Sequence, residues 1–161
     1  MFTIRPIDPN SLSEIETVAT RMRDTLIEVL GEDRGAQMYT LEWLIDRVRF
    51  HLDRDRCTGE VFLATNSSGD ILGHTIVRLD QEENSNLIGL FSTFYISPNH
   101  RQMGIGRAFF SAGEQWFCQH GMALAVTYTH PTNIGLRTLA EKIGYLCDPI
   151  NEDFVRLSKP I

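Results

Sequence analysis

The stretch from Tyr95 to Ala108 constrains the fold of this chain more than any other. Its sequence, YISPNHRQMGIGRA, joins an apolar strand to a helix through a loop that Pro98 interrupts and that contains Gly104 and Gly106. Glycines at such a junction let a ligand approach the backbone closely, because no Cβ stands in the way. The first amides of the helix have no internal partner and lie at the positive end of its dipole. The sequence therefore predicts an anion-binding turn at residues 101–108, and phosphate is the usual ligand of such a turn.

Composition places the chain among soluble globular proteins. Hydrophobic residues make up 42% of its 161 residues and charged residues 22%. This length fits a single domain with a substantial core, which we expect over residues 1–161. No run of about 18 apolar residues occurs, and the first residues lack the basic-then-apolar layout of a signal peptide. We therefore expect neither a membrane span nor a membrane partner.

The net charge and the cysteines argue against a nucleic-acid-binding protein, a disulfide-bonded protein and a zinc protein. A formal net charge of −6 argues against a nucleic-acid partner, because nucleic-acid binders normally carry a basic face. It is compatible with a cationic small substrate, although a mild negative charge is more often a solubility feature. Cys57, Cys118 and Cys147 are odd in number and form no CxxC pair, which favours neither structural disulfides nor a zinc site. We expect no metal and a reducing, cytoplasmic location.

Periodicity predicts one α/β domain without repeats or linkers. Alternating apolar residues indicate an edge strand over residues 2–7, and apolar residues three and four apart indicate helices over 11–30 and 39–52. The charged residues 32–35 are expected to form a loop between these helices. Later elements are strands over 60–65, 71–79 and 87–96, a helix from 105 to Gly121, a strand over 122–128, a helix over 133–144 and closing strands over 145–147 and 154–157. The strands of residues 60–79 are apolar on both faces, which predicts a sheet covered on two sides.

The glycine turn and a second element together resemble a known family. The strand, the pattern Arg101-x-x-Gly104-x-Gly106 and the following helix resemble the acetyl-CoA pyrophosphate motif of the GNAT N-acetyltransferase superfamily. The same family has an asparagine that opens a late helix ending in glycine and an aromatic residue, as Asn133 and Gly144-Tyr145 do here. The order of elements is similar over nearly the whole chain. The resemblance implies a mixed, mostly antiparallel sheet of about seven strands with helices on both faces, the acyl-CoA N-acyltransferase fold.

A dinucleotide-binding Rossmann site is the competing motif, because Gly104 and Gly106 also follow a strand. That fingerprint needs a third small residue three positions further on. Position 109 is Phe, which would crowd the helix against the sheet, and no acidic strand end follows about twenty residues later. A plain glycine turn before a helix is the simpler structural alternative.

By this resemblance, the chain transfers an acetyl group from acetyl-CoA, its cosubstrate, to an amine by direct attack. The backbone of the glycine turn would hold the pyrophosphate, with added charge from Arg101 and Arg107. The strand before the turn would pair with the pantetheine arm, and one of its N–H groups would polarise the thioester carbonyl. The implied cofactor-binding residues are Phe94, Tyr95, Ile96, Arg101, Gln102, Met103, Gly104, Ile105, Gly106, Arg107, Ala108 and Asn133.

The proton chemistry departs from the family pattern. An alkylamine with a pKa near 10.4 is about 3.4 units too protonated at pH 7, a cost of about 4.6 kcal/mol, so a base or a water chain matters. The strand of residues 87–96, where many members carry a carboxylate, contains no Asp or Glu, and Ala140 occupies the position of the family's frequent tyrosine acid. The second loss matters less, because a thiol with a pKa of about 8.5 leaves readily as thiolate.

Three other residues are candidate catalytic groups. His130 follows the strand of residues 122–128, near where acceptor and thioester should meet, and the ordinary pKa of histidine suits a base at neutral pH. Tyr128 could relay or donate a proton. His74 lies in a central strand. Each has a structural interpretation as well: a helix-capping or surface histidine, a packed strand tyrosine and a hydrogen-bonded core histidine. The remaining histidines are expected at the surface: His51, His100 and His120.

The acceptor pocket of this family is bounded by the first helices, the strand end near Tyr128 and the last hairpin. Candidate residues on these segments are Glu32, Asp33, Tyr39, Trp43, Asn151, Glu152 and Asp153. Their acidic members could bind a cationic amine or form solvated loops. The acceptor is therefore an unidentified small-molecule amine, such as a polyamine or amino sugar, or a protein amine. A homodimer, a larger acyl group and a CoA-binding sensor or scaffold without transferase activity stay open as alternatives.

Overall fold

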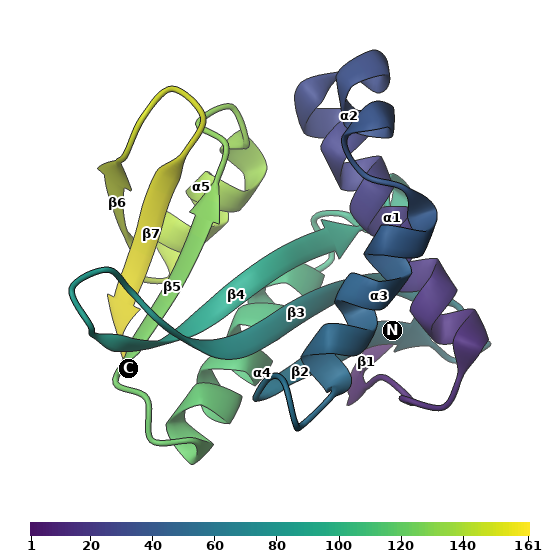
Figure 1. Ribbon diagram of the computed structural model, residues 1–161, viewed down its shortest axis with the longest axis horizontal. Helices are drawn as coiled ribbons and strands as arrows, with labels where there is room; N and C mark the ends of the chain where they lie inside the picture. The colour runs from purple at the N-terminus through teal and green to yellow at the C-terminus, as the bar shows by residue number, and fades with distance from the viewer.

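Seven strands form one mixed sheet, in the order β1-β2-β3-β4-β5-β7-β6, in the computed structural model, which describes residues 1–161 (Figure 1). Every neighbouring pair is antiparallel except β4 and β5, which are parallel. The predicted mostly antiparallel sheet is therefore confirmed. The strands are β1 (Phe2–Pro6), β2 (Gly59–Asn66), β3 (Ile71–Gln81), β4 (Leu87–Ile96), β5 (Leu124–Thr129), β6 (Leu146–Pro149) and β7 (Val155–Pro160).

Helices cover both faces of this sheet, as the apolar strands predict. On one face, α1 (Leu12–Leu30) and α3 (Leu41–Leu52) pack on β2 and β3 around Val18, Val48 and Ile76. On the other face, α4 (Ile105–Gln119) and α5 (Ile134–Lys142) pack on β4 and β5 around Phe91 and Phe110. The short helices α2 (Glu32–Met38) and η1 (Pro98–His100) complete the chain. No helix is long and apolar enough to cross a membrane.

The loop predicted over residues 32–35 is wrong, because these residues begin helix α2. Gly31 adopts a φ of 89°, which turns the chain at the end of α1. Gly35 then lies so close to α1 that a Cβ there would be 2.5 Å from the backbone nitrogen of Ile27. A helix of seven residues is too short to show an apolar period, so this tertiary contact was invisible in the sequence.

Strands β4 and β5 separate after a short paired segment, and this separation positions the candidate site. They pair only from Gly89 to Phe91 on β4 and from Ala125 to Thr127 on β5. The Thr127 hydroxyl donates to the Phe91 carbonyl oxygen over 2.9 Å at the last pair. The next residue, Ser92, is a bulge, because the β3 partners shift between Phe91 and Thr93. Beyond this point the two strands diverge (Figure 1), and we call this opening the split.

Candidate functional site

The glycine turn before α4 presents a row of free backbone donors. No backbone amide from Gln102 to Arg107 donates a hydrogen bond to any other group in the chain. The turn reaches this arrangement through left-handed backbone at Gln102, with a φ of 63°, and at Gly104, with a φ of 90°. These amides lie at the N-terminus of a 15-residue helix, where the dipole favours an anion. The geometry fits a diphosphate group.

The two glycines of the turn serve different purposes. Gly104 has nothing within 4 Å of a Cβ position, so its conformation alone favours glycine there. A Cβ on Gly106 would lie 2.6 Å from Leu139 Cδ2 on α5, so Gly106 allows α5 to pack against α4. Only Gly104 can therefore be tested without also disturbing this packing.

Arg101 is held by protein groups. Its guanidinium forms two hydrogen bonds with the Glu28 carboxylate on α1, at 2.5 and 2.9 Å, and its Nε donates to the Ile96 carbonyl oxygen. The Glu28 hydrogen bonds raise the pKa of Arg101, and Arg101 in turn lowers the pKa of Glu28. Glu28 thus largely neutralises the positive charge that we expected Arg101 to offer a phosphate group. Arg107, on the first turn of α4, forms no ion pair in the structure.

The part of β4 beyond the split offers backbone groups on its free side. The Ser97 amide donates to the Leu72 carbonyl oxygen, so residues 97, 95 and 93 direct their backbone groups toward β3. Phe94 and Ile96 alternate with them and direct their backbone groups into the split. The Ile96 carbonyl is used by Arg101, which leaves the Ile96 N–H and both groups of Phe94 free. An extended, amide-containing ligand could pair here as an added strand.

The side chains of the other predicted cofactor residues have structural contacts. Phe94 packs on Phe91 and Phe110, and the Tyr95 ring lies beside His74 on the opposite face. Asn133 caps α5 by accepting from the Leu136 amide, and its Nδ2 donates to Thr129 Oγ1 at 3.0 Å. Asn133 thereby joins the end of β5 to α5, so its side chain shapes the wall of the split.

A carboxylate lies at the end of β5 that the sequence did not indicate. Tyr128 donates its hydroxyl to Glu82, and Arg156 on β7 holds the same carboxylate through two hydrogen bonds at 2.8 and 2.9 Å. The Arg156 hydrogen bonds lower the pKa of Glu82. Partial burial, followed by the contact with Glu82, raises the pKa of Tyr128. Tyr128 therefore keeps its proton well above neutral pH, and in this structure Glu82 accepts that proton in a hydrogen bond.

This Tyr128 cluster lies at the split, on the face that α1 and α3 cover. Val126 packs with Ile88 and Leu90, whereas Ala125 belongs to the core under α4. Tyr128 lies two residues after Val126 on the same strand, so the two side chains lie on the same face of the sheet. It is also the residue directly after the last β4–β5 pair at Thr127. In the sequence, the only indication that Glu82 belongs to a site was its spacing: Arg78, Asp80 and Glu82 are two residues apart, so on a strand they would share one face.

The two candidate histidines are poorly placed as bases. His74 is completely buried, and this burial lowers its pKa to about 3. His130 Nδ1 accepts the Thr132 amide at 3.2 Å. Because a backbone N–H can only donate, this contact leaves the proton of a neutral ring on Nε2, which then cannot accept another. The structure brings neither histidine into contact with Tyr128.

The predicted acceptor residues lie in two separate regions, one on α2 and α3 and the other in the β6–β7 loop. Tyr39 and Trp43 form an exposed stack between α2 and α3, with ring centroids 4.2 Å apart. Glu32 and Asp33 lie in the first turn of α2. Asn151 closes the β6–β7 loop by accepting from the Asp153 and Phe154 amides. These contacts do not indicate that any of these residues binds the acceptor amine. No group of His, Cys, Asp or Glu side chains is clustered as a metal site.

Comparisons with known proteins concern the family and the fold. The family model described as the acetyltransferase (GNAT) family matches residues 19–145. No curated protein sequence matches the chain. Among solved structures, PaiA N-acetyltransferase from Thermoplasma acidophilum, in complex with coenzyme A, is 14% identical, with a TM-score of 0.77 over 100% of this chain and 99% of that one. A GNAT-family acetyltransferase from Streptococcus pneumoniae is 20% identical, with a TM-score of 0.72 over 100% of both chains. The NatC complex bound to Gag peptide and CoA contains a chain 14% identical, with a TM-score of 0.75 over 99% of this chain and 98% of that one.

Proposed function

The chain belongs to the acetyltransferase (GNAT) family, and on that premise we propose how its own residues carry out acetyl transfer. It is an acetyl-CoA-dependent N-acetyltransferase of unidentified acceptor. When bound, acetyl-CoA supplies an activated acetyl carbonyl that an amine attacks as the CoA thiolate leaves. The observation that supports our assignment of residues is the pair of free donor groups on one stretch of chain: those of Phe94 and Ile96 at the split and those of Gln102 to Arg107 in the glycine turn.

The donor half of the site uses backbone groups. The amides from Gln102 to Arg107 hold the pyrophosphate at the N-terminus of α4. The free groups of Phe94 and the Ile96 N–H hold the pantetheine arm, whose amides can complete strand-like hydrogen bonds. One of these strand N–H groups also donates to the acetyl carbonyl oxygen as its charge develops, a device worth roughly 3–4 kcal/mol where it has been removed.

The proton steps use Tyr128 as the acid and no protein base. Tyr128 turns its hydroxyl away from Glu82, which Arg156 holds beside it, and donates its proton to the leaving thiolate. The proton that the attacking nitrogen loses returns to Tyr128 through water, so one proton in total moves from nitrogen to sulfur. The lowered pKa of Glu82 makes that carboxylate a weak base. The enzyme therefore captures the fraction of the amine that is already neutral. The raised pKa of Tyr128 keeps the acid protonated at the alkaline pH where this fraction is large.

Two measurements, made one after the other, test this assignment. Calorimetry with acetyl-CoA and with CoA should show binding to the purified chain, and absence of both signals would refute the donor site. A thiol-release assay over a panel of amines should then show turnover with kcat/KM rising with pH up to the pKa of the amine. Binding of CoA without thiol release from any amine would favour the sensor or scaffold alternative.

We also propose a reducing, cytoplasmic location. All three cysteines are free, and Cys118 is exposed, as a reducing compartment permits. A tagged protein that fractionates with an oxidising compartment would contradict this. The oligomeric state is a separate question, which light scattering of the purified chain answers.

A further inference from the structure

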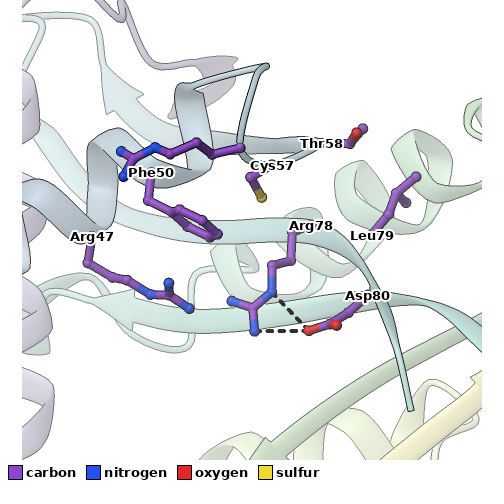
Figure 2. A pocket seen from close by; sticks show the side chains of 8 residues that line it. Arg47, Phe50, Cys57, Thr58, Arg78, Leu79 and Asp80 are labelled. Carbon is purple, nitrogen blue, oxygen red and sulfur yellow. Dashed lines mark hydrogen bonds and ion pairs between the residues drawn. The ribbon is translucent and has the colours of Figure 1, made fainter.

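A cationic pocket opens beside the split, on the face that α3 covers. It has a volume of about 330 Å³ and is lined by Arg47 and Phe50 of α3, by Arg56, and by Arg78 and Asp80 of β3. Figure 2 shows the Arg47 and Arg78 guanidinium groups pointing into the same space from these two elements. Three arginines in one pocket are unexpected in a chain whose net charge is −6.

Carboxylates neutralise two of the three arginines. Asp80 pairs with Arg78 at 3.0 Å, and Asp53, at the end of α3, pairs with Arg56 at 3.0 Å. Arg47 forms no ion pair and no side-chain hydrogen bond, and its guanidinium lies 4.5 Å from the centre of the Phe50 ring. Partial burial and the nearby charge of Arg78 lower the pKa of Arg47. Arg47 is therefore a half-buried cation with free donors and a cation for a neighbour.

His51 fixes the position of Arg78. The sequence predicted His51 at the surface, which is wrong: only 1% of it is exposed. Its Nδ1 donates to the Arg47 carbonyl oxygen at 2.8 Å, so Nε2 is free to accept from Arg78 Nη1 at 3.0 Å. Burial lowers the pKa of His51 to about 4, which keeps the ring neutral beside two arginines at pH 7. The cationic pocket is thus a fixed arrangement of charges.

The cationic pocket adjoins the place where the acetyl group must lie. Arg78 Nη1 also approaches Ser92 Oγ at 3.4 Å, and Ser92 is the bulge residue directly after the last β4–β5 pair. Phe94, whose N–H faces the split, is two residues further, roughly 7 Å along the strand. An amine at the split can therefore place a second group of the same small molecule over Arg47.

We propose that the acceptor is a small amine that also carries an oxyanion group, a carboxylate or a phosphate, which Arg47 and Arg78 bind. Arg47 supplies the open donors and the unpaired charge, and Arg78, which Asp80 already pairs, adds one remaining N–H. This inference rests on the proposed function, because it names the substrate of that same site. It replaces the polyamine-like acceptor that the acidic loops suggested with an acceptor of the opposite charge pattern.

Matched amine pairs test the inference. Lysine and cadaverine differ by one carboxylate, and phosphoethanolamine and ethanolamine differ by one phosphate, so the two pairs distinguish the two oxyanions. We expect kcat/KM to favour the anionic member of at least one pair by about 10- to 100-fold, the range of a charged hydrogen bond. Arg47→Gln should remove most of that preference, and Arg47→Lys should restore part of it. Arg49→Gln is the matched control, since Arg49 is exposed on the same helix and lies outside the pocket.

A binding measurement covers the case in which none of these amines is a substrate. Glutarate or inorganic phosphate should raise the Tm of the wild-type chain and of Arg49→Gln, but not of Arg47→Gln, because a bound ligand stabilises the folded state. Measurable but equal turnover of the paired amines, or equal Tm shifts in wild type and Arg47→Gln, overturns the inference. Calorimetry with CoA separates the two proposals: if CoA binds and Arg47 has no effect, only this inference fails.

Discussion

The donor and acceptor halves of the site are built in different ways. The proposed donor half is one stretch of chain, from Phe94 to Arg107, and the groups that it offers a ligand are backbone amides and carbonyls. The acceptor half collects side chains from distant segments, with Arg47 on α3, Arg78 on β3, Glu82 in the β3–β4 turn and Tyr128 on β5. A continuous backbone site depends on conformation, whereas a discontinuous site depends on side-chain identity and on packing. Substitutions should therefore affect the two halves in different ways.

The largest effect is expected from Gly104→Val in the donor half. The backbone φ of 90° is strained for any residue with a Cβ, so the turn should reshape and lose its aligned amides. We expect CoA affinity to fall on the order of 100-fold by calorimetry, a loss of about 2.7 kcal/mol. Gly69→Val is the matched control, because Gly69 has a φ of 85° and equally open surroundings in the β2–β3 turn. If both variants bind CoA like wild type, the turn is not the phosphate site.

In the acceptor half, Tyr128→Phe should slow turnover while leaving CoA binding intact. Removing the hydroxyl removes the proton donor, but a CoA thiolate leaves readily, so we expect kcat to fall about 10- to 100-fold, at the low end for acid catalysis. Tyr39→Phe is the control, because the Tyr39 hydroxyl forms no hydrogen bond and its ring keeps the stack on Trp43. A kcat equal to that of wild type would exclude Tyr128 as the acid.

His74→Leu should change stability with pH and leave catalysis alone. The folded-state pKa of about 3 lies below the unfolded value of 6.5, so the unfolded chain binds more protons between these values. Stability is therefore full above pH 6.5 and falls as the pH drops, by about 2 kcal/mol at pH 5. The free energy of unfolding in urea should therefore depend less on pH for His74→Leu than for wild type. The control His120→Leu, at an exposed position, should keep the pH dependence of wild type. A changed pH–rate profile would return His74 to the catalytic candidates.

The smallest effect is expected from Arg101→Gln, and it tests whether the donor half depends on side chains at all. The Arg101 and Glu28 side chains are 40% and 50% exposed, and such a solvent-accessible pair is worth about 0–1 kcal/mol. Since Glu28 already neutralises Arg101, CoA affinity should change less than about threefold. Arg107→Gln should weaken binding more, because Arg107 has no carboxylate partner. A larger loss for Arg101 would mean that the donor half also relies on side-chain charge.

The order of elements and most of their limits could be predicted from the sequence, since long periodic segments such as α1 and α4 carry a local signal. Helix α2 could not, because its glycine packs on α1 and its length hides any period. His51 looked like a surface residue on an amphipathic helix, yet hydrogen bonds with the Arg47 carbonyl oxygen and with Arg78 Nη1 satisfy both of its ring nitrogens in the interior.

By itself, the sequence determined the backbone geometry of the proposed donor half, because a strand, a glycine turn and a helix place their backbone groups through local geometry alone. The left-handed conformation at Gly104 is a property of a few consecutive residues, and so is the row of free amides that follows. Tertiary structure alone decided the acceptor half. Tyr128 meets Glu82 and Arg47 meets Arg78 only because the sheet brings distant strands together and α3 packs on β3. No local pattern records a contact between residues that are far apart in the chain.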